Sequence, residues 1–263
     1  MTPPLWLHQV ELLAGPRQSA TSCDALLAPD GSLLAWGEGA TQQAQALGLA
    51  PRLAKGWLLA PLLVDPHSVL EQASGGRAED LASLAGAAAA GGYGTVAILP
   101  WASPWRDQPE KLWLSWPAPM QLELWGSFSI GGADQELAPH GDQLAAGAIG
   151  LAGTDQVPPL ALMERGLLLG EMGRSPVLLT PRDAGLSGGG FVREGVETLR
   201  AGWPPDPVLS ETLPLQSLLS LAELRPEARL ALMNLATAAG GGAAAPGATA
   251  PHGHRGLVAP AGR

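Results

Sequence analysis

The stretch LLVDPHSVLEQ, residues 62–72, decides how the chain is interpreted. Its apolar start and its ending in Asp65, Pro66 and His67 predict a β-strand that presents a histidine at its carboxyl end. Such a histidine is typical of a metal site in which a second histidine follows two residues later. Val69 stands at that position instead, and the question is whether the chain is an enzyme or the remains of one.

Beyond this strand, apolar runs alternate with longer helical stretches, which favours a parallel α/β arrangement. The predicted strands are LLVD, GTVAILP, MQLELWGSFS, AAGAIGLAG, SPVLLT and RLALMNLA, and the predicted helices cover residues 77–92, 159–173 and 213–226. Gly91 and Gly92 are expected to end the first helix, and Gly173 is the expected C-cap of the second.

The two ends of the chain differ from this central part. Residues 1–60 contain short apolar runs with a hairpin turn at Asp30 and Gly31, which predicts a small β-rich annex. Residues 61–237 then form the α/β domain. Residues 238–263 are mostly Ala, Gly and Pro and predict a disordered tail, in which His252 and His254 are interpreted as solvated side chains.

Composition excludes several classes of protein. With 46% hydrophobic residues in 263, the chain can bury a core, and a net charge of −9 argues against a nucleic-acid partner. Cys23 is the single cysteine, which excludes an internal disulfide and a Cys-rich zinc site. No apolar run reaches the roughly 18 residues of a membrane span, and no signal-peptide pattern is found. We therefore expect a soluble cytoplasmic protein without nucleic-acid or membrane partners.

Three segments in order carry a family resemblance: LLVDPH (62–67), GGYGTVAILPWASPWRDQ (91–108) and RDAGLSGGGFVREGVETLRAGWPPDP (182–207). Over roughly residues 7–240 the chain resembles the dihydroorotases and related cyclic amidohydrolases. The resemblance implies a TIM-type (β/α) barrel of the metal-dependent hydrolase kind, with a small N-terminal β-sandwich annex. It also implies zinc-dependent hydrolysis of a cyclic amide, the interconversion of dihydroorotate and carbamoyl aspartate in pyrimidine biosynthesis.

The same resemblance indicates which site residues have changed. The first metal-binding histidine corresponds to His67, which is retained, and the second to Val69. The arginine and asparagine that bind substrate correspond to Glu71 and Trp101. The later histidines correspond to Thr180, Ala231 and Asn234, none of which is a histidine. We therefore expect His67 to be a vestigial ligand and no zinc to be bound.

The carboxylate positions that the resemblance implies also indicate that the metal site has been lost. A carboxylated lysine from a middle strand is excluded, because the lysines of this chain are Lys55 and Lys111. Asp155 could supply a bridging aspartate, but the double aspartate of the family is not reproduced in register. The catalytic aspartate near the end of the barrel has no counterpart.

The chain is also short for this fold, because a full barrel takes about 250 residues before any annex or tail is added. At least two strand–helix units are expected to be missing, and the change of composition at Ala238 suggests a truncation or a shifted reading frame. Tryptophans are dense between residues 101 and 125, at Trp101, Trp105, Trp113, Trp116 and Trp125. They are expected in the core; alternatively, some fill the volume vacated by metal and substrate, or form a contact surface.

The sequence therefore predicts a degenerate, C-terminally truncated dihydroorotase-like protein that has lost catalysis. Two alternatives remain open. The first is a non-catalytic binding or scaffold subunit, for which the resemblance suggests aspartate transcarbamoylase as partner, or self-association. The second is a fragment without a selected function.

Overall fold

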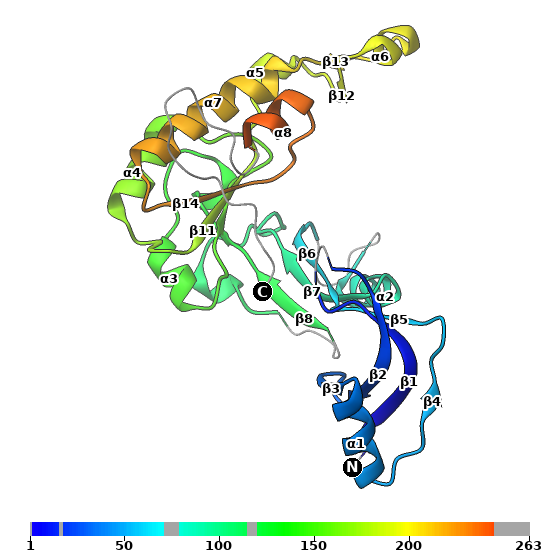
Figure 1. The fold of residues 1–263 in the computed structure, drawn as a ribbon. Helices are drawn as coiled ribbons and strands as arrows, with labels where there is room; N and C mark the ends of the chain where they lie inside the picture. The colour runs from blue at the N-terminus through cyan, green and yellow to red at the C-terminus, as the bar shows by residue number, and fades with distance from the viewer. Residues whose placement is uncertain (1, 16–17, 71–78, 115–119, 245–263) are drawn as a thin grey trace. The chain divides into compact units, whose positions relative to one another are not determined.

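The computed structural model describes residues 2–15, 18–70, 79–114 and 120–244. It divides the chain into two compact units, Met1–Leu63 and Val64–Arg263, which are treated separately below (Figure 1). Among the helices within the described ranges, none has both the length and the apolar character needed to cross a membrane.

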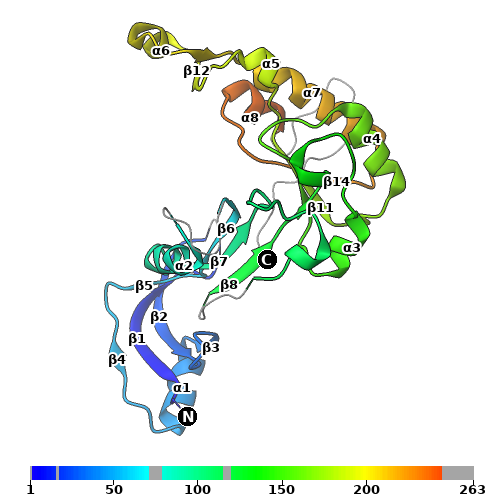
Figure 2. The same ribbon diagram turned by 180° about the vertical axis from the view of Figure 1, so that it is seen from behind.

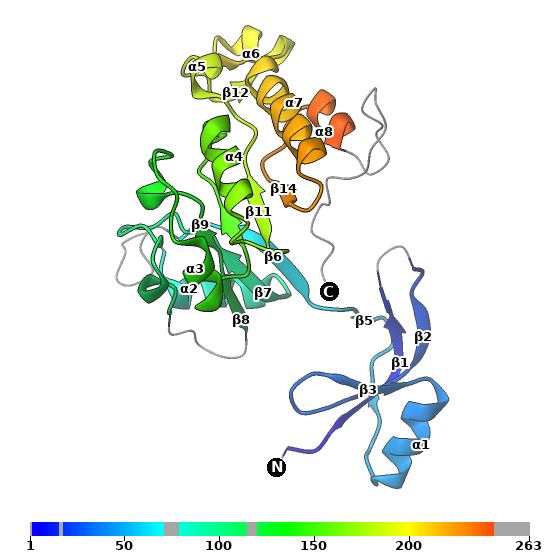
Figure 3. The same ribbon diagram turned by 90° about the vertical axis from the view of Figure 1, so that its left-hand side faces the viewer.

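The first unit is built on one sheet (Figure 3). Strands β1 (Leu5–Leu12), β2 (Thr21–Leu27) and β3 (Leu33–Trp36) pair antiparallel in sequence order. Two short strands, β4 (Arg52–Leu53) and β5 (Leu58–Leu59), pair with β1 in parallel. The hairpin turn predicted at Asp30 and Gly31 is confirmed, because the Asp30 carboxylate accepts hydrogen bonds from the Ser32 backbone and hydroxyl, while Gly31 has a φ of 86°.

The annex also contains a helix that the sequence did not predict, α1 (Glu38–Ala46). Its buried residues are Ala40 and Ala44, one turn apart, and they pack against Trp6 and Leu26 of the sheet. Small alanines let the helix lie close to the sheet, but they leave little apolar periodicity in the sequence. The described residues of this unit thus form one sheet covered by a helix, and the expected β-sandwich is not confirmed.

The second unit is α/β with parallel sheets, as predicted. One sheet contains β6 (Leu63–Ser68), β7 (Tyr93–Ile98) and β8 (Gln121–Leu124). A second contains β9 (Gly126–Ser127), β10 (Leu151–Ala152), β11 (Pro176–Leu179) and β14 (Arg229–Leu232). Only Trp125 separates β8 from β9, and its backbone N–H donates to the Ile98 carbonyl at 3.0 Å. The two sheets therefore meet at Trp125 and continue each other.

Helices connect these strands as the alternating pattern predicts. The helices that connect the strands of the two sheets include α2 (Leu81–Ala90), α3 (His140–Ala145), α4 (Leu160–Leu169) and α7 (Leu209–Leu224). Helix α2 begins with a capping box formed by Asp80 and Ser83 and ends at Gly91, as expected. Shorter elements are η1 (Pro109–Lys111), η2 (Ile130–Gly132), α5 (Ala184–Ser187), β12 (Val192–Arg193), α6 (Val196–Ala201) and β13 (Pro205–Asp206).

Two helix boundaries differ from the prediction. Helix α4 ends at Leu169 because Gly170 takes the left-handed conformation, so Gly173 is not its C-cap. Helix α7 begins at Leu209, well before Pro214, although proline lacks the N–H that a helix interior requires. The Ser210 carbonyl, which Pro214 leaves without its helical partner, accepts a hydrogen bond of 2.9 Å from the Asp183 backbone N–H.

The predicted disordered tail also begins differently. Residues Ala238–Ala244 form helix α8, despite three glycines in seven residues. The Thr237 hydroxyl accepts a hydrogen bond of 2.9 Å from the Gly240 N–H, in the manner of an N-cap. Gly240 is buried and lies against the Glu211 carboxylate, with which a Cβ at this position would clash. His252 and His254 lie outside the described residues.

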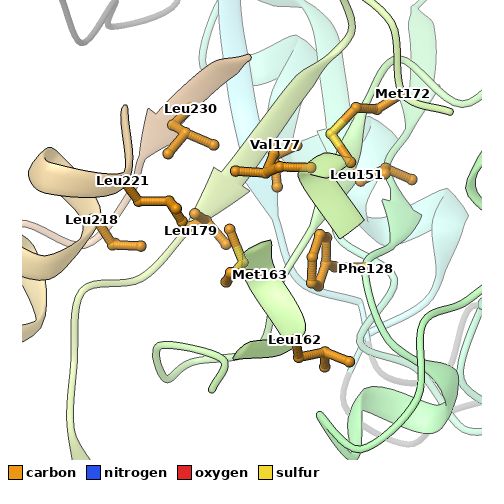
Figure 4. Close-up of a cluster of buried hydrophobic side chains, with 11 residues drawn as sticks. Phe128, Leu151, Leu162, Met163, Met172, Val177, Leu179, Leu218, Leu221 and Leu230 are labelled. Carbon is orange, nitrogen blue, oxygen red and sulfur yellow. The ribbon is translucent and has the colours of Figure 1, made fainter. Parts of the chain in front are cut away.

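The largest core lies between the helices and one face of the strands (Figure 4). Side chains from α4 and α7 pack there against alternate residues of β10, β11 and β14. Its buried members are Phe128, Leu151, Leu162, Met163, Leu167, Met172, Val177, Leu179, Leu218, Leu221 and Leu230. A second core packs α2 against Val96 and Ile98 of β7. Both leave the opposite face of the strands to be filled by other residues.

Candidate functional site

The opposite face of the strands is filled by an apolar group that we call the strand-end cluster. Side chains alternate along each strand, so Ala97 and Leu99 point away from the face that carries Val96 and Ile98. The buried members of the strand-end cluster are Ala97, Leu99, Trp125, Ala152, Leu178, Ala231 and Met233, with Trp101 and Ile149 partly buried against them. Every one of these side chains lacks a charged group.

Three tryptophans fasten the strand ends to one another. Trp125 donates its indole N–H to the Pro66 carbonyl, and Trp101 donates to the Gly153 carbonyl, each at 2.8 Å. Trp105 donates to the Ser127 hydroxyl, also at 2.8 Å. Each bond links residues that are more than twenty positions apart and so joins different strand–helix units. Trp113, by contrast, is 78% exposed, and Trp116 lies outside the described residues.

The first predicted ligand, His67, lies near the end of β6 and is half-buried. The carboxylate beside it, Asp65, accepts hydrogen bonds from the His67 backbone N–H at 3.2 Å and from the Ser68 hydroxyl at 2.6 Å. Val69 follows the strand and is exposed. The predicted position Glu71 lies outside the described residues. Asp65 therefore has a structural role in shaping the strand end.

The structure brings together two of the positions predicted from separate strands. Thr180 follows β11 and is buried, and Asn234 follows β14 with a φ of 59°. The Asn234 side-chain amide donates to the Thr180 hydroxyl at 3.4 Å. Ala231 lies within the strand-end cluster and is opposite Leu178 in the parallel register. The carboxyl ends of two adjacent parallel strands thus bring a hydroxyl and an amide together, with the Ala231 methyl group in the neighbouring strand-end cluster.

A charged pair beside the strand ends was not predicted. Arg106 is 4% exposed and donates a hydrogen bond to the Leu99 carbonyl, and its burial lowers its pKa to about 10. Burial alone would raise the pKa of Asp107, but hydrogen bonds from the Lys111 ammonium and the Gly131 backbone hold it below its usual value. The sequence WRDQ gives a charged pair inside a tryptophan-rich loop, which is the one signal that could have indicated this anchoring.

The annex contains a second polar group, centred on Asp24. Its carboxylate lies 2.9 Å from both the Trp6 indole nitrogen and His8 Nδ1, and 3.0 Å from the Thr41 hydroxyl. These partners line a shallow hollow of about 540 Å³ that also contains Cys23. Burial tends to raise the pKa of Asp24, but its hydrogen bonds, led by that of Trp6, lower it overall. The carboxylate thus fastens β1 and β2 to α1.

The donor set at the strand ends does not fit the zinc centre that the resemblance implies. A zinc site needs three or four nitrogen, sulfur or carboxylate ligands converging on one point. The other positions that the resemblance assigns to ligands hold the alkyl, hydroxyl and amide groups of Val69, Thr180 and Asn234, and Asp155 is exposed. Across residues 2–15, 18–70, 79–114 and 120–244, no three His, Cys, Asp or Glu side chains lie close enough together to hold a metal ion.

Comparison with known proteins gives consistent similarities. No protein-family model matches the sequence. A dihydroorotase-like protein of Synechocystis sp. is 34% identical over 190 residues, which cover 62% of this chain and 43% of that protein. A dihydroorotase of Solibacter usitatus is 29% identical over 195 residues, covering 67% of this chain and 45% of that protein. The chain thus spans less than half the length of these curated relatives.

A solved structure extends the similarity to the fold. The L-hydantoinase (dihydropyrimidinase) of Arthrobacter aurescens aligns with 90% of this chain and 54% of its own, with a TM-score of 0.62. The sequence identity is 16%, so the likeness is one of fold.

Proposed function

We propose that this chain is a dihydroorotase-like member of the amidohydrolase family over the part that its relatives cover. On this proposal it is a partial TIM-type barrel that has lost the family's catalytic site. In barrels of this kind, the site lies at the carboxyl ends of the strands. The observation that carries the proposal is the strand-end cluster, which places buried tryptophan, leucine and methionine side chains at those ends.

The chemistry of cyclic amide hydrolysis explains why an apolar strand-end cluster supports the loss of catalysis. Opening a cyclic amide requires an activated water, and in a metal-dependent hydrolase several side chains must hold the metal that activates it. A lone imidazole at His67 provides one ligand and leaves the other positions to groups that bind zinc poorly. The indoles of Trp101 and Trp125 also use strand-end carbonyls as acceptors, so they are held in place by hydrogen bonds as well as by packing.

A second function is favoured by a different observation. Several large apolar side chains, Phe191 and Trp203 among them, are exposed in the second unit. Exposed apolar surface of this kind is typical of protein–protein contacts. The alternative is therefore a non-catalytic binding or scaffold subunit of the cytoplasm. Aspartate transcarbamoylase is the partner that the resemblance suggests, and co-purification of the two proteins tests that assignment.

The catalytic part of the proposal is tested by a dihydroorotate hydrolysis assay. Purified full chain is incubated with dihydroorotate and added zinc, and carbamoyl aspartate is measured against a buffer blank. The dihydroorotase of Solibacter usitatus, assayed in parallel, shows that the conditions support turnover. We expect no product above the uncatalysed rate. Turnover that disappears with a chelator and returns with zinc would overturn the proposal.

A further inference from the structure

Residues 188–208 form an arm of the second unit that contains β12, α6 and β13. In Figures 1 and 2, α6 lies at the outer end of this arm, beyond α5 and α7. Strands β12 and β13 pair in parallel at its base, Val192 with Pro205 and Arg193 with Asp206. Gly190 permits this close approach, because a Cβ there would lie 2.1 Å from the Pro205 carbonyl oxygen.

The arm exposes four large apolar side chains within thirteen residues. Phe191 is 70% exposed, Val196 64%, Leu199 69% and Trp203 55%. Single exposed apolar residues are ordinary, but a group of them that includes two aromatic rings is unusual on a surface that faces only water. Tryptophan and other aromatic residues are also enriched at the centres of protein interfaces.

The arm is held in one conformation by buried polar contacts at its base. Arg193 donates to the Glu211 carboxylate and to the Ser210 hydroxyl, each at 2.8 Å, and lies 3.3 Å from the Asp206 carboxylate. Glu211 and Ser210 belong to α7 and are almost completely buried. Because the base is fixed to a core helix, the exposed side chains are presented in a defined arrangement. Preorganisation of this kind lowers the entropic cost of binding.

We propose that the arm is a self-association surface, and that its partner is the arm of a second copy of this chain. The charges of the arm favour a second copy of this chain as the partner. The whole chain has a net charge of −9, so most of its surface repels a second copy. Residues 188–208 contain two arginines and three carboxylates, a net charge of −1. The arm is thus a nearly neutral apolar surface on an acidic protein.

The pattern along α6 is also self-complementary. Glu197 and Arg200 are exposed on the same side of the helix and form an ion pair of 2.7 Å across one turn. In a two-fold contact, residue i meets residue j of the partner while j meets i. Two antiparallel copies of α6 that meet at Val196 therefore bring each Glu197 to the Arg200 of the partner subunit, with the two Leu199 side chains in contact beside these pairs.

The exposed apolar side chains of the arm provide about half of the area that a standard interface buries. From the exposed fractions and typical side-chain areas, the four apolar side chains offer about 450 Å² per copy. A standard interface buries about 800 Å² per partner. The remainder must come from the polar side chains and backbone of the arm. This proposal does not depend on whether catalysis has been lost.

Sedimentation velocity of the full chain over a range of concentrations tests the proposal. The wild type should show a discrete dimer, and Leu199→Glu should shift it to monomer, with at least a tenfold higher dissociation constant. The matched control is Leu224→Glu, a substitution of a 73% exposed leucine on α7, which should leave the dimer intact. Phe191→Ser provides a second arm variant in case Leu199→Glu reduces expression.

A charge exchange distinguishes a specific contact from nonspecific hydrophobic association. Glu197→Arg alone should weaken the dimer, because it opposes two arginines across the axis. Adding Arg200→Glu to the same chain should restore it. A wild-type monomer throughout the concentration range overturns the proposal, as does association that is unchanged by Leu199→Glu and Phe191→Ser. Equal loss of association in Leu224→Glu also overturns it, because the contact would then not be specific to the arm.

Discussion

Trp125 donates its indole N–H to the carbonyl oxygen of Pro66 at 2.8 Å and thereby reaches from the end of β8 to the residue that precedes His67. Strand β7 lies between the two strands that this bond joins, and the Trp125 ring packs against Ala97 and Leu99 on its inner face. The buried tryptophan therefore belongs to the same strand ends as the retained histidine. The stability of the fold should depend on it.

Replacing this tryptophan should be costly. Trp125→Ala removes a buried ring and its hydrogen bond, and we expect the free energy of unfolding to fall by about 3–5 kcal/mol. Trp125→Phe keeps most of the volume but leaves the Pro66 carbonyl without its donor, so a loss of about 1–2 kcal/mol is expected. Chemical denaturation measures both. The control is Trp113→Ala, at a 78% exposed position, which should change stability by less than about 0.5 kcal/mol.

Two adjacent glycines of α8 should respond in opposite directions to the same substitution. Gly240→Ala places a methyl group 2.2 Å from the Glu211 carboxylate and should destabilise the fold, because Glu211 also binds Arg193 and the start of α8. Gly241→Ala meets nothing within 4 Å and should stabilise the helix by about 0.5–1 kcal/mol. Thermal melting of the two variants checks this. Equal shifts of the melting temperature would contradict the placement of α8.

Asp24 should make the annex sensitive to acid. Its pKa is lowered in the folded chain from the usual value of 3.8, so the stabilisation it gives is complete above that value. The stabilisation is then lost as the pH falls through the folded pKa, below 3.8.

The urea midpoint measured from neutral to strongly acidic pH should therefore fall less steeply in Asp24→Asn than in the wild type. Asp155→Asn is the control, because that carboxylate is exposed and belongs to the second unit, so its loss should change the slope much less. The interpretation would be wrong if the two variants altered the pH dependence equally.

Restoring one ligand should not restore activity. Val69→His rebuilds the histidine pair with His67 but leaves Thr180, Ala231 and Asn234 in place. Groups that act together in catalysis contribute little one at a time. We expect dihydroorotate hydrolysis by Val69→His to stay at the uncatalysed rate with zinc present. Measurable turnover would mean that the remaining ligands come from other residues.

Local chemistry made part of the fold predictable from the sequence. The strand that ends at His67, the turn at Gly31 and the end of helix α2 at Gly91 each depend on a few neighbouring residues, and each was predicted. Helices α1 and α8 were not predicted, because they are held by close packing of alanine and glycine, which gives no apolar periodicity.

The candidate site, like the fold, was predictable from the sequence only in part. The proximity of Thr180 and Asn234 follows from a general rule, that the carboxyl ends of adjacent parallel strands meet at one edge. The bonds from Trp125 to Pro66 and from Trp101 to Gly153 depend on residues more than fifty positions apart. The burial of Arg106 depends equally on distant packing, and the charged pair in WRDQ is the one local signal of it.

The most direct measurement of the central claim is the zinc content of the purified chain. Protein expressed with added zinc and then dialysed should hold much less than one equivalent per chain, because the strand ends offer His67 without converging partners. Any residual zinc should be the same in His67→Ala. One or two tightly held zinc ions per chain, lost on His67→Ala, would contradict the claim that the metal site has been lost.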